Sequence, residues 1–190
     1  INLAKLINRP FEKGASMDLT ALRELTGTAV RMLDNVIDIS RYPIDQQREE
    51  AVSKRRIGLG ITGLADALIM CGVRYGSEEA VNLTKNWSRV LRDSAYGCSI
   101  DLAKEKGSFP LFVKEKFIEN HNVKKLPKDL RAGINSYGIR DALLTSIAPT
   151  GTISLLANNV SSGLEPVFAF KYNRKVLQSD GSTFIEPVSD

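Results

Sequence analysis

Short apolar runs alternate with segments of helical spacing along most of this chain, and that alternation restricts the folds it can adopt. Apolar residues alternate with glycine or threonine from 57 to 62, which predicts a strand, and residues 64–70 then follow a helical pattern. The apolar run Leu143–Ala148 predicts a buried strand, and residues 153–157 predict a helical turn after it. Strands that alternate with helices favour an α/β fold with parallel strand pairing.

Helices dominate the rest of the pattern. Ser16 or Asp18 can cap a helix that ends near Ile39, and Ser77 can cap a long helix that runs to about Lys106. The first of these helices places apolar residues at helical spacing: Leu19, Leu22, Leu25, Ala29, Leu33, Val36 and Ile37. Shorter helices are expected over 45–54, where charge indicates a surface position, and from Pro127 to about Ser136.

The remaining segments predict shorter elements. Residues 1–7 indicate a short strand or strand end, and residues 109–125 indicate a mixed, charged surface segment. The tail over 168–190 alternates loosely around Asp180-Gly181, which predicts a β-hairpin. Without a clear internal boundary or repeat, residues 1–190 are expected to form one domain or a large part of one.

The composition excludes several classes of protein. The chain has only two cysteines, Cys71 and Cys98, and they form no closely spaced pair, so no disulfide framework is expected and a reducing, cytoplasmic setting is. No apolar run approaches the roughly 20 residues of a membrane span. A net charge of +4 does not demand a nucleic-acid partner. Because the chain opens at Ile1 rather than Met, it is expected to be a piece of a longer polypeptide.

A turn of small hydroxyl residues follows the run that ends at Ala148. Six residues form the candidate anion-binding loop: Pro149, Thr150, Gly151, Thr152, Ile153 and Ser154. Backbone N–H groups at the start of a helix favour anions, hydroxyls add donors, and a glycine lets the ligand approach the backbone. A turn that merely connects two elements explains the same pattern, and the residues alone leave both readings open.

The sequence of that loop, together with Ser161-Ser162-Gly163-Leu164-Glu165-Pro166, closely resembles the substrate-phosphate loop of ribonucleotide reductase catalytic subunits. The Gly-Thr-Ile-Ser variant is most similar to the adenosylcobalamin-dependent class, although a metal-radical class stays possible. Three further stretches resemble the family in the same order: residues 1–4, residues 33–38 with Tyr42-Pro43, and residues 55–66. The resemblance extends from Ile1 to about Leu177.

The resemblance implies a part of a ten-stranded, helix-rich α/β barrel. It implies an oxidoreductase that makes deoxyribonucleotides for DNA replication by radical chemistry, with the loop 149–154 holding the ribonucleotide phosphate. The family's catalytic cysteines would lie upstream of Ile1, so the segment alone is expected to be inactive, with no catalytic or metal-binding residues. Adenosylcobalamin, with its cobalt, would belong to the parent enzyme. The rest of the catalytic chain and a homo-oligomer are the expected partners, because a cut barrel exposes strand edges and apolar faces.

Two other functions remain as alternatives. Gly58, Gly60 and Gly63 match a dinucleotide-binding fingerprint, but a basic stretch precedes them and no acidic residue closes a second strand. The glycines are therefore interpreted as sites where a strand packs closely against its helix. The other alternative is a non-enzymatic helical protein that uses the long helix after Ser77 as its contact surface.

Several reactive residue types are interpreted as structural. The basic runs, Lys54-Arg55-Arg56 and Lys124 with Lys125 and Lys128, are expected to be solvated rather than to bind phosphate or nucleic acid. Both cysteines are expected to be small buried hydrophobic residues, and His121 to be exposed. Three polar residues that follow the loop are Asn158, Asn159 and Glu165, and Glu165 is expected to hold a turn rather than to organise a pocket. Asn2 is a candidate for the edge of that pocket.

Overall fold

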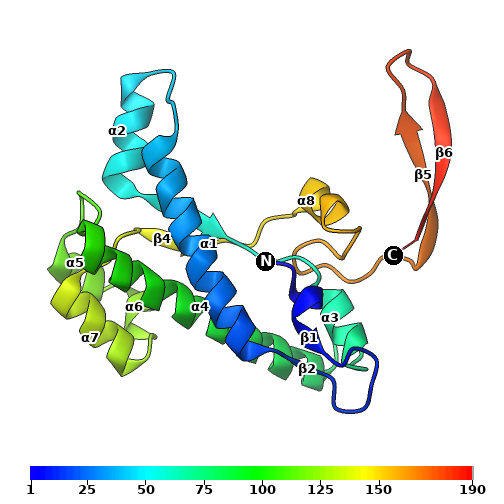
Figure 1. Cartoon of the computed structure of the whole chain (residues 1–190), viewed down its shortest axis with the longest axis horizontal. Helices are drawn as coiled ribbons and strands as arrows, with labels where there is room; N and C mark the ends of the chain where they lie inside the picture. The colour runs from blue at the N-terminus through cyan, green and yellow to red at the C-terminus, as the bar shows by residue number, and fades with distance from the viewer. Residues whose placement is uncertain (190) are drawn as a thin grey trace. The chain divides into compact units, whose positions relative to one another are not determined.

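The computed structural model describes residues 1–189 (Figure 1). These residues divide into two compact units. The first unit contains residues 18–60 and 82–147 together with Ile1, and the second contains residues 2–17, 61–81 and 148 onward. The first unit holds α1 (Leu19–Ile39), α2 (Asp45–Lys54), β3 (Arg56–Leu59), α5 (Lys114–Ile118), α6 (His121–Lys124), α7 (Lys128–Tyr137) and β4 (Leu143–Thr145). The second holds η1 (Leu3–Leu6), β1 (Ile7–Asn8), β2 (Ser16–Met17), α3 (Leu64–Met70), α8 (Gly151–Leu156), β5 (Lys171–Leu177) and β6 (Thr183–Ser189).

The main helices begin where their capping residues predict. The Asp18 carboxylate accepts hydrogen bonds from the backbone N–H groups of Thr20 and Ala21, at 3.1 and 2.9 Å, and so caps α1. Ser77 accepts from the Ala80 N–H at 3.1 Å, at the start of α4 (Glu78–Lys106). The predicted bounds of α2 and α3 are confirmed, and α7 begins directly after Pro127. The sequence signals therefore account for α1, α2, α3, α4 and α7.

The strands form three separate two-stranded sheets within residues 1–189. Only β3 and β4 form a parallel pair of named strands, and an isolated parallel bridge joins Asn2 to Thr62. The pairs β1–β2 and β5–β6 are antiparallel, and the second is the predicted hairpin, in which the Asp180 carboxylate accepts from the Ser182 N–H at 2.9 Å. The α/β prediction is thus confirmed for one parallel pair, whereas parallel pairing through the chain is not. The described residues form no closed barrel.

Two of the predicted strands are shorter in the structure than expected. The run Leu143–Ala148 was expected to be a buried strand, but β4 ends at Thr145, and only Leu144 of its residues is buried. Its partner β3 has only four residues, so pairing stops there, and Ile147 is 64% exposed. Residues 1–7 were expected to be a short strand or strand end; only Ile7 belongs to a strand, and Asn2 caps a 3-10 turn over Leu3–Leu6, its side chain accepting from the Ala4 N–H.

The core of the first unit includes a segment that was expected at the surface. Residues 109–125 were predicted to be a mixed, charged surface segment, yet Phe109 and Val123 are 7% and 3% exposed. Phe109, Phe112 and Phe117 pack against one another in edge-to-face and tilted arrangements, with ring centroids 5.3–5.9 Å apart. The prediction of a mixed, charged surface segment is confirmed for most of these residues, which are exposed, but it missed the aromatic residues that pack against the core and the short helices α5 and α6.

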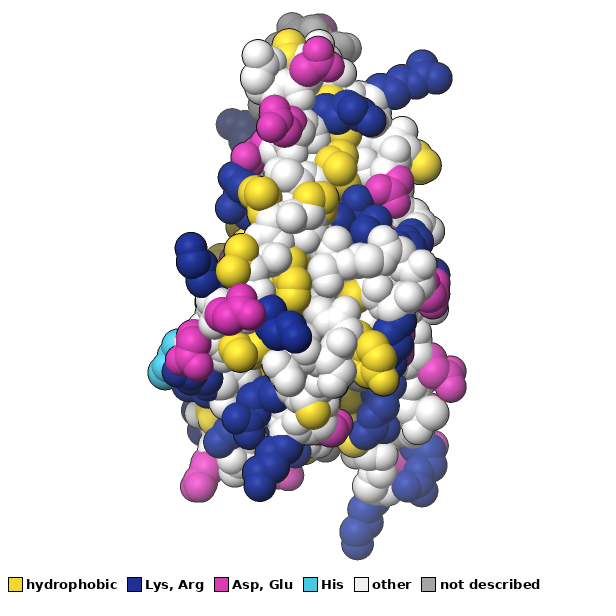
Figure 2. Space-filling model, turned by 90° about the vertical axis from the view of Figure 1, so that its left-hand side faces the viewer, with side chains coloured by type: hydrophobic (Ala, Val, Ile, Leu, Met, Phe, Trp, Pro, Cys, Tyr) yellow, Lys and Arg dark blue, Asp and Glu magenta, His cyan; other side chains and the backbone are white. Residues whose placement is uncertain are grey.

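One face of the molecule shows how the charge is distributed (Figure 2). Lysine and arginine side chains are interspersed there with acidic and hydrophobic ones. This face therefore presents no continuous surface of a single sign of charge, as expected for a net charge of only +4. None of the described helices is both long enough and apolar enough to cross a membrane.

Candidate functional site

The loop after Ala148 is fixed by a hydrogen bond to a second stretch of the same unit. Thr150 has a left-handed backbone (φ 46°) and precedes α8, and its hydroxyl oxygen accepts from the Gly163 N–H at 2.8 Å. Gly163 also has a positive φ of 49°, and a Cβ built on it would lie 2.7 Å from the Ala148 carbonyl oxygen. The close approach of the two stretches therefore requires glycine at 163.

Ser154 stabilises the loop from inside. Its side chain is buried and donates to the Gly151 carbonyl at 2.9 Å, while its oxygen lies 2.9 Å from the Ser162 hydroxyl. The single hydroxyl proton of Ser154 is thereby used within the chain. Ser154 was expected to offer a donor to an anion; in this arrangement it holds the first turn of α8 against Ser162.

The second stretch is anchored in turn on the start of α3. The carbonyl of Ser161 accepts from the Gly63 N–H at 2.7 Å, and its hydroxyl accepts from the Ala65 N–H at 3.1 Å. The Asp66 carboxylate accepts from the Ser161 N–H at 2.7 Å. Ser161 is buried, so these bonds form away from water and position the candidate loop through Gly163.

A cavity of about 470 Å³ opens beside the loop. The residues that line it come from α8, from the connection that follows and from β5: Gly151, Thr152, Ser154, Leu155, Asn159, Val160, Ser161, Ser162, Glu165, Pro166, Val167, Phe168, Ala169, Tyr172 and Arg174. Three of the six candidate residues, Gly151, Thr152 and Ser154, therefore line the cavity, whereas Pro149, Thr150 and Ile153 do not. Sequence reasoning did not identify Tyr172 and Arg174, which reach the cavity from the hairpin.

Some of the polar residues near the loop line the cavity, and others do not. Asn159 and Glu165 line the cavity, and Asn158 does not. The Glu165 N–H donates to the Ser162 carbonyl at 2.8 Å, so Glu165 lies in a turn, but this bond does not involve its side chain. The amide of Asn2 donates to the Ala157 carbonyl at the end of α8, at 3.5 Å, and Asn2 does not line the cavity.

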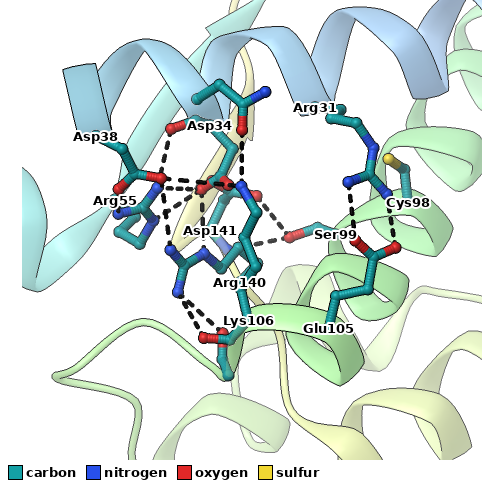
Figure 3. A network of polar contacts seen from close by, with 12 residues as sticks. Arg31, Asp34, Asp38, Arg55, Cys98, Ser99, Glu105, Lys106, Arg140 and Asp141 are labelled. Atoms are coloured by element: carbon teal, nitrogen blue, oxygen red, sulfur yellow. Dashed lines mark hydrogen bonds and ion pairs between the residues drawn. The ribbon is translucent and has the colours of Figure 1, made fainter. Parts of the chain in front are cut away.

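A second polar cluster lies in the first unit, where three cations surround one buried carboxylate (Figure 3). Asp34 is fully buried and pairs with Arg55, with Lys106 at 3.0 Å and with Arg140 at 3.2 Å. Arg55 is 2% exposed and also pairs with Asp38 at 2.8 Å. Burial opposes ionisation of Asp34, but hydrogen bonds from Arg55 and Lys106 outweigh it and lower the pKa of this carboxyl.

This cluster corrects the expectation that the run Lys54-Arg55-Arg56 is solvated. Lys54 and Arg56 pair with Glu50 at the surface, as expected, but Arg55 turns inward to Asp34 and Asp38. The left-handed backbone of Arg55 (φ 45°) at the end of α2 directs the chain this way. Asp34 and Asp38 are four residues apart on one face of α1, a spacing that was the available sequence signal.

Asp141 extends the buried cluster. One carboxylate oxygen accepts from the Ser99 hydroxyl at 2.8 Å, and the other has no hydrogen-bond partner within residues 1–189. Burial, and more weakly the charge of Asp34, raises the pKa of Asp141 to about 7, although the bond from Ser99 acts in the opposite direction. The cluster lines none of the cavity beside the loop, so we assign it to the stability of the first unit.

The other candidate reactive groups contribute no site. Cys71 and Cys98 are free and partly buried, and burial raises the pKa of both thiols. His121 is exposed at the start of α6, as expected. Within residues 1–189, histidine, cysteine and acidic side chains form no group that could hold a metal ion.

The glycines of the dinucleotide fingerprint are required by packing within the chain. A Cβ on Gly58 or Gly60 would lie 2.7 or 2.9 Å from an oxygen of Ser146, the residue that follows β4. A Cβ on Gly63 would lie 2.7 Å from the Asn2 side chain. The close-packing interpretation is thus confirmed, although the neighbour of Gly58 and Gly60 is the end of a parallel strand rather than a helix.

Comparison with known proteins gives a consistent match along the whole chain. The family described as "Ribonucleotide reductase, barrel domain" matches residues 1–188. A vitamin B12-dependent ribonucleoside-diphosphate reductase of Mycobacterium tuberculosis is 40% identical over 177 residues, which cover 93% of this chain and 22% of that protein. A protein of the same name from Thermoplasma acidophilum is 34% identical over 99% of this chain and 22% of its own length.

A less similar relative is also named as a ribonucleoside-diphosphate reductase subunit. A ribonucleoside-diphosphate reductase subunit alpha of Chlamydia muridarum is 32% identical over 86% of this chain and 18% of that protein. The chain therefore spans about a fifth of the length of the relatives that it matches.

Proposed function

The chain belongs to the ribonucleotide reductase family, and from this premise we propose that it forms part of a catalytic chain that reduces ribonucleotides to deoxyribonucleotides. In this proposal the loop 149–154 binds the phosphate of the ribonucleotide. The phosphate anchors the substrate, and a fixed anchor sets the position of the ribose for the reaction. The catalytic groups themselves are expected in other parts of that chain.

The single observation that carries the loop assignment is the open space beside Gly151. A Cβ built on this glycine meets no atom of the chain within 4 Å, so packing within the chain does not require glycine there. Several other glycines also have open space there, but Gly151 is the only glycine among the described residues that line the cavity. A glycine with free space at the edge of a cavity suits a ligand that approaches the backbone closely.

The chemistry of the loop suits a phosphate. Gly151 and Thr152 begin α8 and line the cavity, so backbone N–H groups and one hydroxyl are available to phosphate oxygens. Thr150 and Ser154 keep the turn in place through Gly163 and Ser162. Two residues therefore contact the substrate, and two position the loop.

The cofactor of the parent enzyme follows from the names of its relatives. Because the Mycobacterium tuberculosis and Thermoplasma acidophilum proteins are named as vitamin B12-dependent, we infer that the parent enzyme uses adenosylcobalamin. We assign no residue of this segment to the cofactor.

The partners follow from the apolar residues that the segment leaves exposed. Leu156 of α8 is 90% exposed, and Phe168 beside the hairpin is 93% exposed. Exposed apolar residues of this size favour contact with further protein surface. We therefore infer that other segments of the catalytic chain cover them, completing a ten-stranded barrel, in a cytoplasmic, homo-oligomeric enzyme of deoxyribonucleotide biosynthesis.

Thr152→Val tests the loop assignment in the complete catalytic chain. The substitution keeps the shape of the side chain and removes its hydroxyl, so the Kd for a ribonucleoside diphosphate should rise about tenfold, the effect of one lost hydrogen bond to a charged group. Thr183→Val is the matched control, because Thr183 is exposed on β6 and lies outside the cavity. Unchanged affinity in Thr152→Val, or equal losses in both variants, would contradict the assignment.

A further inference from the structure

The cavity beside the loop contains one basic side chain. Among its described lining residues, Arg174 is the only lysine or arginine, and Glu165 is the only acid. The loop 149–154 itself carries no charged residue. A nucleotide phosphate brings at least one negative charge into this cavity, and the loop has only dipoles and hydroxyls to balance it.

Arg174 faces the cavity because of its position in the hairpin. Alternate residues of β5 are half-buried, namely Tyr172, Arg174 and Val176, whereas the residues between them are exposed. Lys175 is the next residue along the strand, and its side chain belongs to the exposed set. Two adjacent cations of one strand are thus on opposite faces, and only Arg174 lines the cavity.

The guanidinium of Arg174 is held in place without an acidic partner. Its Nη2 donates to the Tyr172 hydroxyl at 2.8 Å, and its central carbon lies 5.7 Å from the Tyr172 ring centroid. Glu186 faces it across the hairpin, but the ion pairs of residues 1–189 do not include Arg174. Its remaining N–H donors are therefore available to a ligand in the cavity.

We propose that Arg174, which lines the same cavity as the loop, binds the phosphate of the substrate. The planar guanidinium donates to phosphate oxygens, Tyr172 orients it, and its charge compensates for the lack of a cation in the loop. This inference rests on the proposed function, because it takes the same ligand in the same cavity. It adds a charged contact that the loop motif does not contain.

The test measures the binding of a ribonucleoside diphosphate to the complete catalytic chain. Arg174→Gln should raise the Kd about ten- to hundredfold, the range expected for losing hydrogen bonds to a charged group. Arg174→Lys should give an intermediate Kd, because an ammonium keeps the charge but not the planar donor geometry. Lys175→Gln is the matched control, and its Kd should stay within about twofold of the unchanged protein.

The outcomes separate this inference from the proposed function. A loss of affinity in Arg174→Gln but not in Lys175→Gln, with partial rescue by Arg174→Lys, supports the inference. Unchanged affinity in Arg174→Gln, alongside reduced affinity in Thr152→Val, overturns the role of Arg174 and leaves the proposed function intact. If the unsubstituted chain binds no ribonucleotide, the proposed function fails, and this inference fails with it.

Discussion

Two glycines of the candidate site are predicted to respond to alanine in opposite ways. Gly151 has open space around its missing Cβ, whereas a Cβ on Gly163 would lie 2.7 Å from the Ala148 carbonyl oxygen. Gly163 also has a positive φ, and Gly151 is not among the positive-φ residues. Gly163→Ala should therefore disturb the loop, and Gly151→Ala should leave it folded while obstructing the ligand.

The structure sets the size of each effect. A left-handed backbone costs a residue with a Cβ about 1–2 kcal/mol. The forced contact with Ala148 adds about 1–3 kcal/mol, so Gly163→Ala should lower the free energy of unfolding by about 2–5 kcal/mol in total. Gly151→Ala should raise that free energy by about 0.4–1 kcal/mol, because alanine restricts the unfolded chain without meeting a neighbour in the folded one.

The assay pairs thermal unfolding with nucleotide binding on the complete catalytic chain. Gly151→Ala should unfold at or slightly above the temperature of the unsubstituted protein, yet bind a ribonucleoside diphosphate about tenfold more weakly, a difference of roughly 1.4 kcal/mol. Gly163→Ala should unfold at a lower temperature. Normal binding by a stable Gly151→Ala variant would refute the argument that the space beside Gly151 is kept for a ligand.

Two further predictions concern the buried cluster of the first unit. Asp34→Asn removes the negative charge with which Arg55, Lys106 and Arg140 pair. The free energy of unfolding, measured by urea denaturation, should fall by about 3–5 kcal/mol. A loss below about 1 kcal/mol would contradict a stabilising role of the buried ion pairs. Asp141 has a folded pKa of about 7, above its unfolded value of 3.8, so its contribution to stability is greatest at low pH and falls as pH rises from about 4 to about 7. Asp141→Asn should flatten that part of the stability profile, and an unchanged profile would show that this carboxyl titrates normally.

The sequence predicts the helices well because their signals are local. Asp18 and Ser77 cap α1 and α4 through bonds to residues two or three positions away, and the Asp-Gly pair makes the β5–β6 turn in the same way. The burial of Arg55 is not local, because it depends on Asp34 and Asp38, 21 and 17 residues earlier in the chain. The extent of β4 likewise depends on the length of its partner β3.

The residues of the candidate site also differ in whether the local sequence could identify them. Gly151, Thr152 and Ser154 belong to one continuous motif, so a resemblance over a few residues was enough to select them. Tyr172 and Arg174 reach the same cavity from a strand 20 residues further along, where nothing in the local pattern distinguishes Arg174 from Lys175. Only the alternation of the folded strand separates the two cations.

A crystal structure of the complete catalytic chain with a bound ribonucleoside diphosphate would test the central claim most directly. The account predicts that the phosphate lies in the cavity, against the backbone of Gly151 and Thr152 and within hydrogen-bond distance of the Arg174 guanidinium. A phosphate found elsewhere, for instance beside Gly58 and Gly60 on β3, would contradict the assignment of the loop.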